Sequence, residues 1–268
     1  MIRICDWLAR LLCRLLDPAE RDAVRGDLAE SGVTGGRALR EVLGLVARRQ
    51  AGLWNDWQPW LALLGIAAPF GVLLSQFSSS LSGISAIYLW MYWDNGRVAD
   101  LETPGVRRML AGDLEGFALM ALALIAWSWT SGFALGTLSR RTLWINASLF
   151  GLALLAPLAY VPSGTTLGRH TFNAPVFALG FYSVVWPRIG QFALVLLPAI
   201  WGVRRAHRRG ALRLPSALVW AVVVGTLTEL HPSIWAGSPV RPLLLLRVLL
   251  TWPAMYLVVT ARRRRATA

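Results

Sequence analysis

Residues 117–138 read FALMALALIAWSWTSGFALGTL and determine the architecture of this chain. These 22 residues carry no charge, and a helix of about 20 apolar residues crosses the roughly 30 Å hydrocarbon core of a bilayer. Five other stretches have a similar apolar character, and we expect all six to be membrane-spanning helices. The six stretches are residues 60–77, 117–138, 143–161, 184–203, 216–230 and 243–260. The sequence therefore predicts an all-α, polytopic membrane protein with six transmembrane helices.

The overall composition agrees with membrane insertion. Apolar residues make up 56% and charged residues 15% of the 268 residues, more apolar surface than one soluble core of this size could hide. The net charge of +13 raises nucleic-acid binding as an alternative, and the distribution of Arg decides against it. Residues 139–142, 204–215 and 261–268 together hold 11 Arg in 24 residues and no acid. Short Arg-rich segments between spans follow the positive-inside rule, so we expect a lipid bilayer and no nucleic acid as partner.

The charge pattern also orients the predicted spans. With the Arg-rich segments in the cytoplasm, both termini lie there too, and the loops at 78–116, 162–183 and 231–242 face outward. The fifth span has only 15 residues, but without it the Arg-rich tail would face outward, against the rule. Within the long outer loop, residues 81–93 are too few to span. We expect them to form a separate interfacial or re-entrant helix, ended by Asp94-Asn-Gly96.

Residues 1–56 precede the first span and form a predicted cytoplasmic prefix of short helices. Residues 2–16 have the 3.6-residue periodicity of an amphipathic helix and do not read as a cleavable signal peptide. Asp17-Pro-Ala-Glu20 is a helix start with a capping box, which predicts a second helix over residues 18–30. The run SGVTGG at 31–36 breaks the pattern before a third helix leads into the first span. Helices this short need the membrane surface, each other or a partner protein to cover their apolar faces.

Two runs in this prefix carry a resemblance to a known family. They are LLDPAERDAVRGDLAE at 15–30 and GGRALREVLGLVARRQ at 35–50, and GDLAE at 26–30 is the most distinctive part. They resemble the small helical prefix ahead of the transmembrane part of acidobacterial-type permeases, and the opening of uncharacterised multi-span proteins. The rest of the chain has neither the large extracytoplasmic domain nor the four-span arrangement of those permeases. The resemblance implies a multi-pass protein of the bacterial inner membrane that is associated with a permease.

Charged side chains near the outer ends of the spans form a candidate polar site. Glu229 is the only acid in the six predicted spans, and Arg188 and Arg247 lie in the same outer half of the membrane. His231 and Arg241 sit in the adjacent outer loop. Charges in a membrane usually pair with each other or face a water-filled cavity. Glu229 and Arg247 lie on consecutive antiparallel spans, so we expect them to form an ion pair. A structural pair is the simpler interpretation, and an outward-open vestibule for an anion is the functional alternative.

Small residues form a ridge on the second span. Ser128, Gly132 and Gly136 recur at four-residue spacing, a pattern that lets a neighbouring helix approach closely. We expect this ridge to pack inside the bundle, with homodimerisation through it as the alternative.

Catalytic and metal-binding patterns are lacking in the sequence. Trp129-Thr-Ser-Gly132 resembles the serine turn of rhomboid proteases, but Trp replaces the expected Gly and no His follows in a later span. The sequence has no HExxH motif, no acidic metal cluster and no Walker A motif. Cys5 and Cys13 lack companions at metal-ligand spacing, so we interpret them as small, partly buried apolar residues. We expect no cofactor and no metal.

Three functions remain open from the sequence. The leading hypothesis is a non-enzymatic accessory or interaction subunit of the inner membrane, with a membrane-protein partner or a second copy of itself. The second is a transporter-like protein for a small anionic solute, with Glu229, Arg188 and Arg247 lining its site. An intramembrane enzyme ranks third, because no nucleophile can be matched with a base.

Overall fold

The chain folds into helices and connecting turns. The structure is a computed structural model that describes residues 7–8, 11–13, 18–30, 35–94, 97–139, 142–159, 181, 185–230 and 240–261. No β-strand occurs among these residues, which confirms the all-α prediction for the described part of the chain. The chain divides into two compact units, Met1–Pro59 and Trp60–Ala268, close to the boundary predicted after residue 56.

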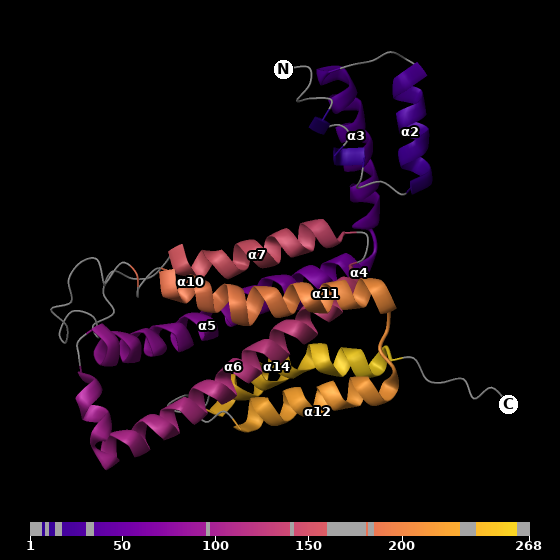
Figure 1. The fold of residues 1–268 in the computed structure, drawn as a ribbon. Helices are drawn as coiled ribbons and strands as arrows, with labels where there is room; N and C mark the ends of the chain where they lie inside the picture. The colour runs from indigo at the N-terminus through magenta and orange to yellow at the C-terminus, as the bar shows by residue number, and fades with distance from the viewer. Residues whose placement is uncertain are drawn as a thin grey trace. The chain divides into compact units, whose positions relative to one another are not determined.

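The N-terminal unit contains α2 (Pro18–Glu30) and α3 (Gly36–Leu53) (Figure 1). Both helices lie where the sequence predicts them. Gly35 precedes α3 with φ of 66°, a left-handed conformation that glycine adopts without strain. Of the helix predicted at residues 2–16, most lies outside the described residues.

A small core holds the N-terminal unit together. Cys13 is buried with Val42 and Val46, as expected for an apolar residue, and Cys5 lies outside the described residues. The apolar residues packed against this core are Leu12, Val24, Leu28, Leu39 and Leu45. An ion pair between Arg49 and Glu20 adds a second connection from α3 to α2. The unit therefore buries part of its apolar surface by internal packing.

The C-terminal unit is built from long helical runs. The first run begins with α4 (Trp57–Trp60), at the boundary between the units, and continues with a π-helical segment (Leu61–Ala67), α5 (Ala68–Leu89) and a second π-helical turn (Trp90–Asp94). A short 3₁₀ helix (Arg97–Glu102) leads to α6 (Pro104–Leu138), and α7 (Leu143–Ala159) follows. A later run contains α10 (Trp186–Gln191), a π-helical turn (Phe192–Leu196) and α11 (Leu197–Arg209). The last two helices are α12 (Leu214–Leu230) and α14 (Val240–Val259).

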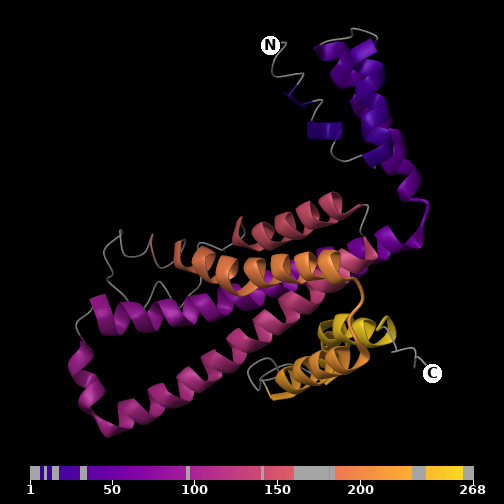
Figure 2. The ribbon, with the colours of Figure 1, turned by 45° about the vertical axis from the view of Figure 1, so that its right-hand side comes forward.

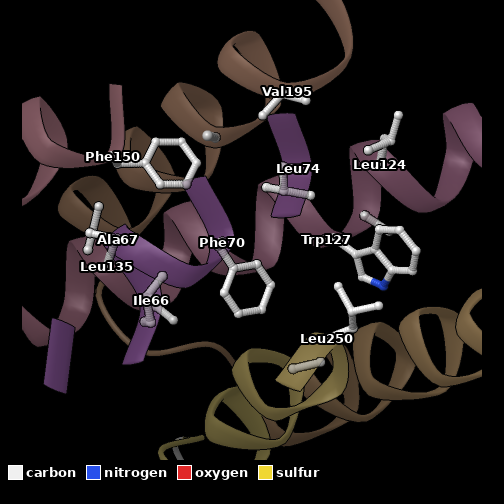
Figure 3. Packing of buried hydrophobic residues seen from close by; sticks show 14 of the residues in the cluster. Ile66, Ala67, Phe70, Leu74, Leu124, Trp127, Leu135, Phe150, Val195 and Leu250 are labelled. Carbon is white, nitrogen blue, oxygen red and sulfur yellow. The ribbon is translucent and has the colours of Figure 1, made fainter. Parts of the chain in front are cut away.

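Helix α6 is the central element of this unit. It packs against α5, α11, α12 and α14, while α7 and α10 pack against α5 (Figures 1 and 2). Figure 3 shows the core between these helices, where Phe70 and Leu74 of α5 lie near Trp127 of α6 and Leu250 of α14. All four side chains are completely buried.

Two helical runs are long and apolar enough to cross a membrane, Trp57–Tyr92 with 36 residues and Pro104–Leu138 with 35. They contain the first and second predicted spans. Shorter apolar helices coincide with the third, fifth and sixth, and the run from α10 to α11 coincides with the fourth. The described part of every predicted span is therefore helical, apart from turn residues at its ends.

Residues 81–93 are helical, as predicted, but they do not form an interfacial or re-entrant helix of their own. These residues continue the run of α5 without interruption, and α6 already begins at Pro104. At 1.5 Å per residue, the run of 36 residues is about 54 Å long and exceeds the thickness of a bilayer core. The prediction failed because a span ends at the bilayer thickness, whereas a helix continues until a residue breaks its hydrogen bonds. Tyr88 donates a hydrogen bond to Asp113 and ties the extended end of α5 to α6.

A proline closely follows each of two π-helical segments. Pro69 has no N–H to donate to the Gly65 carbonyl one turn earlier, and the helix before it is widened over Leu61–Ala67. The indole Nε1 of Trp252 on α14 donates to that Gly65 oxygen at 3.1 Å. Pro198 likewise follows the widened turn Phe192–Leu196. A carbonyl released by proline thus becomes a contact point between helices.

Candidate functional site

The predicted ion pair between α12 and α14 is present. Arg247 Nη1 lies 3.1 Å from Glu229 Oε2. The two side chains keep 40% and 58% of their surface exposed, so the pair lies at the surface of the unit and not in its packed interior. An ion pair with this exposure contributes at most about 1 kcal/mol.

Arg188 does not join this pair. It lies on α10, which packs against α5, whereas α12 and α14 pack against each other and against α6. Its Nη1 lies 3.4 Å from Oε1 of Gln191 on the same helix. His231 and the side chain of Arg241 lie outside the described residues. Among the described members of the predicted cluster, Glu229 and Arg247 therefore pair with each other, while Arg188 bonds to Gln191.

Gln191 is the centre of a buried polar group that the sequence analysis missed. Its Nε2 donates to Ser75 Oγ at 3.1 Å and to the Leu154 carbonyl at 2.6 Å. Ser75 Oγ also donates to the Leu154 carbonyl, at 2.7 Å. These bonds connect α5, α7 and α10 at one point. An amide inside an apolar stretch was the available signal, because a buried amide needs hydrogen-bond partners.

The same face of α5 carries further serines toward α10. Ser82 is buried, and a Cβ added to Gly190 would lie 2.3 Å from its Oγ. One turn further, Trp186 Nε1 donates to Ser85 Oγ at 2.9 Å. We call the contact made by Ser75, Ser82, Ser85, Trp186, Gly190 and Gln191 the serine seam. Its hydroxyl and amide groups position α10 on α5.

The predicted small-residue ridge packs inside the chain, against α11. A Cβ added to Gly132 would lie 2.2 Å from the Ala199 carbonyl oxygen, and one added to Gly136 would lie 3.0 Å from Ala206 Cβ. Gly202 of α11 lies just as close to the backbone of α6, because a Cβ added to it would lie 2.3 Å from the Trp129 carbonyl oxygen. We call this contact the glycine seam. Ser128, Gly132 and Gly136 are all buried, so α11 covers this ridge within the chain.

The hydroxyls of the Trp129–Gly132 motif donate hydrogen bonds to backbone carbonyls of their own helix, α6. Thr130 Oγ1 donates to the Ala126 carbonyl at 2.8 Å, and Ser131 Oγ donates to the Ser128 carbonyl at 3.0 Å. Trp129 stacks on Trp220 with ring centroids 4.0 Å apart. Hydroxyls bonded to backbone carbonyls are not activated by a base, so this motif has the environment of a packing element.

Comparisons give no family for this chain. Protein-family models, curated proteins and solved structures were compared with it, and none matches. Within the described part of the chain, no three His, Cys, Asp or Glu residues gather in a way that could hold a metal ion.

Proposed function

We propose that the C-terminal unit is a membrane-embedded bundle of six helices, and that the chain acts as a non-enzymatic accessory or interaction subunit of the bacterial inner membrane. The distribution of its side chains carries the proposal. Buried polar side chains include Ser75, Ser78, Ser82, Ser128, Thr130, Ser131, Asn146, Gln191 and Thr228. Large apolar side chains on its surface include Leu64, Val72, Leu122, Leu152, Ile189, Phe192, Val219, Val222, Leu245 and Val248. Water would disfavour such a surface, whereas lipid solvates it.

The lengths of the helices support embedding. Two runs exceed the bilayer core, and the shortest helices among the proposed spans, α7 and α12 with 17 residues each, are about 26 Å long. A span this short is accommodated by local thinning of the bilayer. With six spans, the Arg-rich segments lie in the cytoplasm together with both termini.

Two observations favour a subunit over a transporter. The glycine seam brings backbone atoms of α6 and α11 into direct contact, which leaves no passage between these two helices. The ion pair of Glu229 and Arg247 is neutral as a pair, and Arg188 lies elsewhere. The separate N-terminal unit supplies a surface for a partner, because Trp7, Leu11 and Leu43 keep 59%, 42% and 53% of their surface exposed.

Purification of the full chain from its native membrane in a mild detergent tests the subunit role. We expect a membrane-protein partner at a stoichiometric ratio, identified by mass spectrometry. Triple replacement of Trp7, Leu11 and Leu43 by Ser should release it, while the matched triple replacement of Val72, Leu122 and Val219 by Ala, on the C-terminal unit, should not. A lone protein that carries a small molecule would contradict the subunit role and favour a transporter.

Reporter fusions test the embedding separately. Fusions after Arg141, Arg209 and Arg265 should report the cytoplasm. Fusions near Asp100, Gly168 and Gly237 should report the outside. An outside signal at Arg265 would remove one span from the proposed topology.

A further inference from the structure

We infer that Arg188 marks a binding site for a phosphate group beside the serine seam, occupied by the headgroup of a phospholipid or by free phosphate. This inference rests on the proposed embedding of the C-terminal unit but not on the proposed partner. It starts from the difference between the two arginines near the outer ends of the spans. Arg247 is neutralised by Glu229, whereas Arg188 forms no ion pair with any carboxylate among the described residues.

The helices that hold Arg188 in place carry no counter-charge. The sequence has no Asp or Glu between Glu115 and Glu229, a stretch that includes α7, α10, α11 and the segments between them. Helix α5, against which α10 packs, has none either. Arg188 is partly buried, and a partly buried cation in a membrane needs an anionic or polar partner. Gln191 supplies a polar partner but no charge, so an anion from outside the chain is the available source of a neutralising charge.

The backbone around Arg188 is held in place on both sides. Trp186 is bonded to Ser85, and Gly190 lies directly against Ser82. Gln191 is bonded to α5 and α7, and its Oε1 accepts the one hydrogen bond that Arg188 makes among the described residues. The backbone that carries Arg188 is thus fixed before a ligand arrives, and the bond to Gln191 restrains the guanidinium, which lowers the entropic cost of binding.

The free donors of Arg188 define the chemical class of the ligand. A guanidinium has five N–H donors in a planar fork, and the bond to Gln191 uses one of them. Such a fork binds two oxygens of a phosphate side by side. The neighbouring side chains of Val185, Ile189 and Phe192 keep 44%, 49% and 52% of their surface exposed. This apolar border fits the acyl chains of a lipid and also leaves access for free phosphate.

Binding to the purified full chain in a neutral detergent tests the site. Two ligands are titrated separately, a short-chain phosphatidylglycerol followed by native mass spectrometry and inorganic phosphate followed by calorimetry. Arg188→Gln should weaken binding by about tenfold or more, because the fork is lost. Arg188→Lys keeps the charge without the fork, so its affinity for the ligand should lie between that of wild type and that of Arg188→Gln. The matched control is Arg213→Gln, which changes an exposed arginine immediately before α12 and should bind like wild type.

The two ligands separate the possible sources. Arg188-dependent binding of the lipid alone assigns the site to a headgroup, and Arg188-dependent binding of inorganic phosphate assigns it to the free ion. Equal binding by wild type, Arg188→Gln and Arg188→Lys would overturn the inference, and so would an equal loss in Arg213→Gln. Melting curves of each variant report folding, and the Lys variant keeps the test decisive if the Gln variant does not fold. A failed lipid titration leaves the topology fusions unaffected, so the two proposals fail separately.

Discussion

The glycine seam and the serine seam solve the same packing problem with different chemistry. In the glycine seam, Gly132 and Gly202 bring the backbones of α6 and α11 together without any side chain between them. In the serine seam, Ser75, Ser85 and Gln191 connect helices through side-chain hydrogen bonds. The first depends on shape and tolerates no added atom, while the second depends on polar groups and can lose one bond at a time. This difference sets the expected order of mutational effects.

The largest effect should follow from filling the glycine seam. Gly132→Leu adds a Cβ that would lie 2.2 Å from a backbone oxygen, so the helices must separate. We expect a loss of about 3 kcal/mol or more and a large fall in the melting temperature of the detergent-purified protein. Gly112→Leu on the same helix is the control, because nothing lies within 4 Å of its added Cβ. Equal melting of the two variants would show that α6 and α11 are not in contact there.

An intermediate effect should follow from removing the central amide of the serine seam. Gln191→Leu loses the donors to Ser75 and to the Leu154 carbonyl, and we expect a loss of about 1–2 kcal/mol. The matched control is Gln76→Leu, which changes an exposed amide on α5. A double-mutant cycle with Ser75→Ala measures the coupling, and additive changes in the free energy of unfolding would mean that the two side chains do not interact.

A smaller effect should come from the hydrogen bond between the Trp252 indole on α14 and the Gly65 backbone carbonyl. Trp252→Phe removes the donor to Gly65, whose carbonyl Pro69 cannot satisfy. We expect a loss of about 1 kcal/mol in thermal unfolding. Trp144→Phe serves as the control because that indole is 73% exposed. If Trp252→Phe melts no lower than this control, the bond does not contribute to stability.

The smallest effect should come from the exposed ion pair. Glu229→Gln and Arg247→Leu should each cost about 0.5 kcal/mol, and the double variant should recover part of the combined loss. A coupling of several kcal/mol in the cycle would instead place the pair in a dry environment, where breaking a pair is far more costly.

Local sequence patterns were sufficient for the helices and for one contact of the candidate site. The break at Gly35 and the ridge of Ser128, Gly132 and Gly136 depend on residues within a few positions of each other. The pairing of Glu229 with Arg247 could be predicted because their helices are consecutive and joined by a short loop. In each case the short distance along the chain limits the arrangements that are possible.

Only the tertiary structure decided which distant surfaces meet. The sequence favoured packing of the ridge on α6 inside the bundle but did not identify its partner, which is α11, where Gly202 supplies the complementary small surface. Gln191 finds partners on α5 and α7, far from it in sequence, and Arg188 bonds to Gln191. A periodic pattern identifies the face that a helix will bury, but the partner for that face is selected by shape and hydrogen bonding among all helices at once.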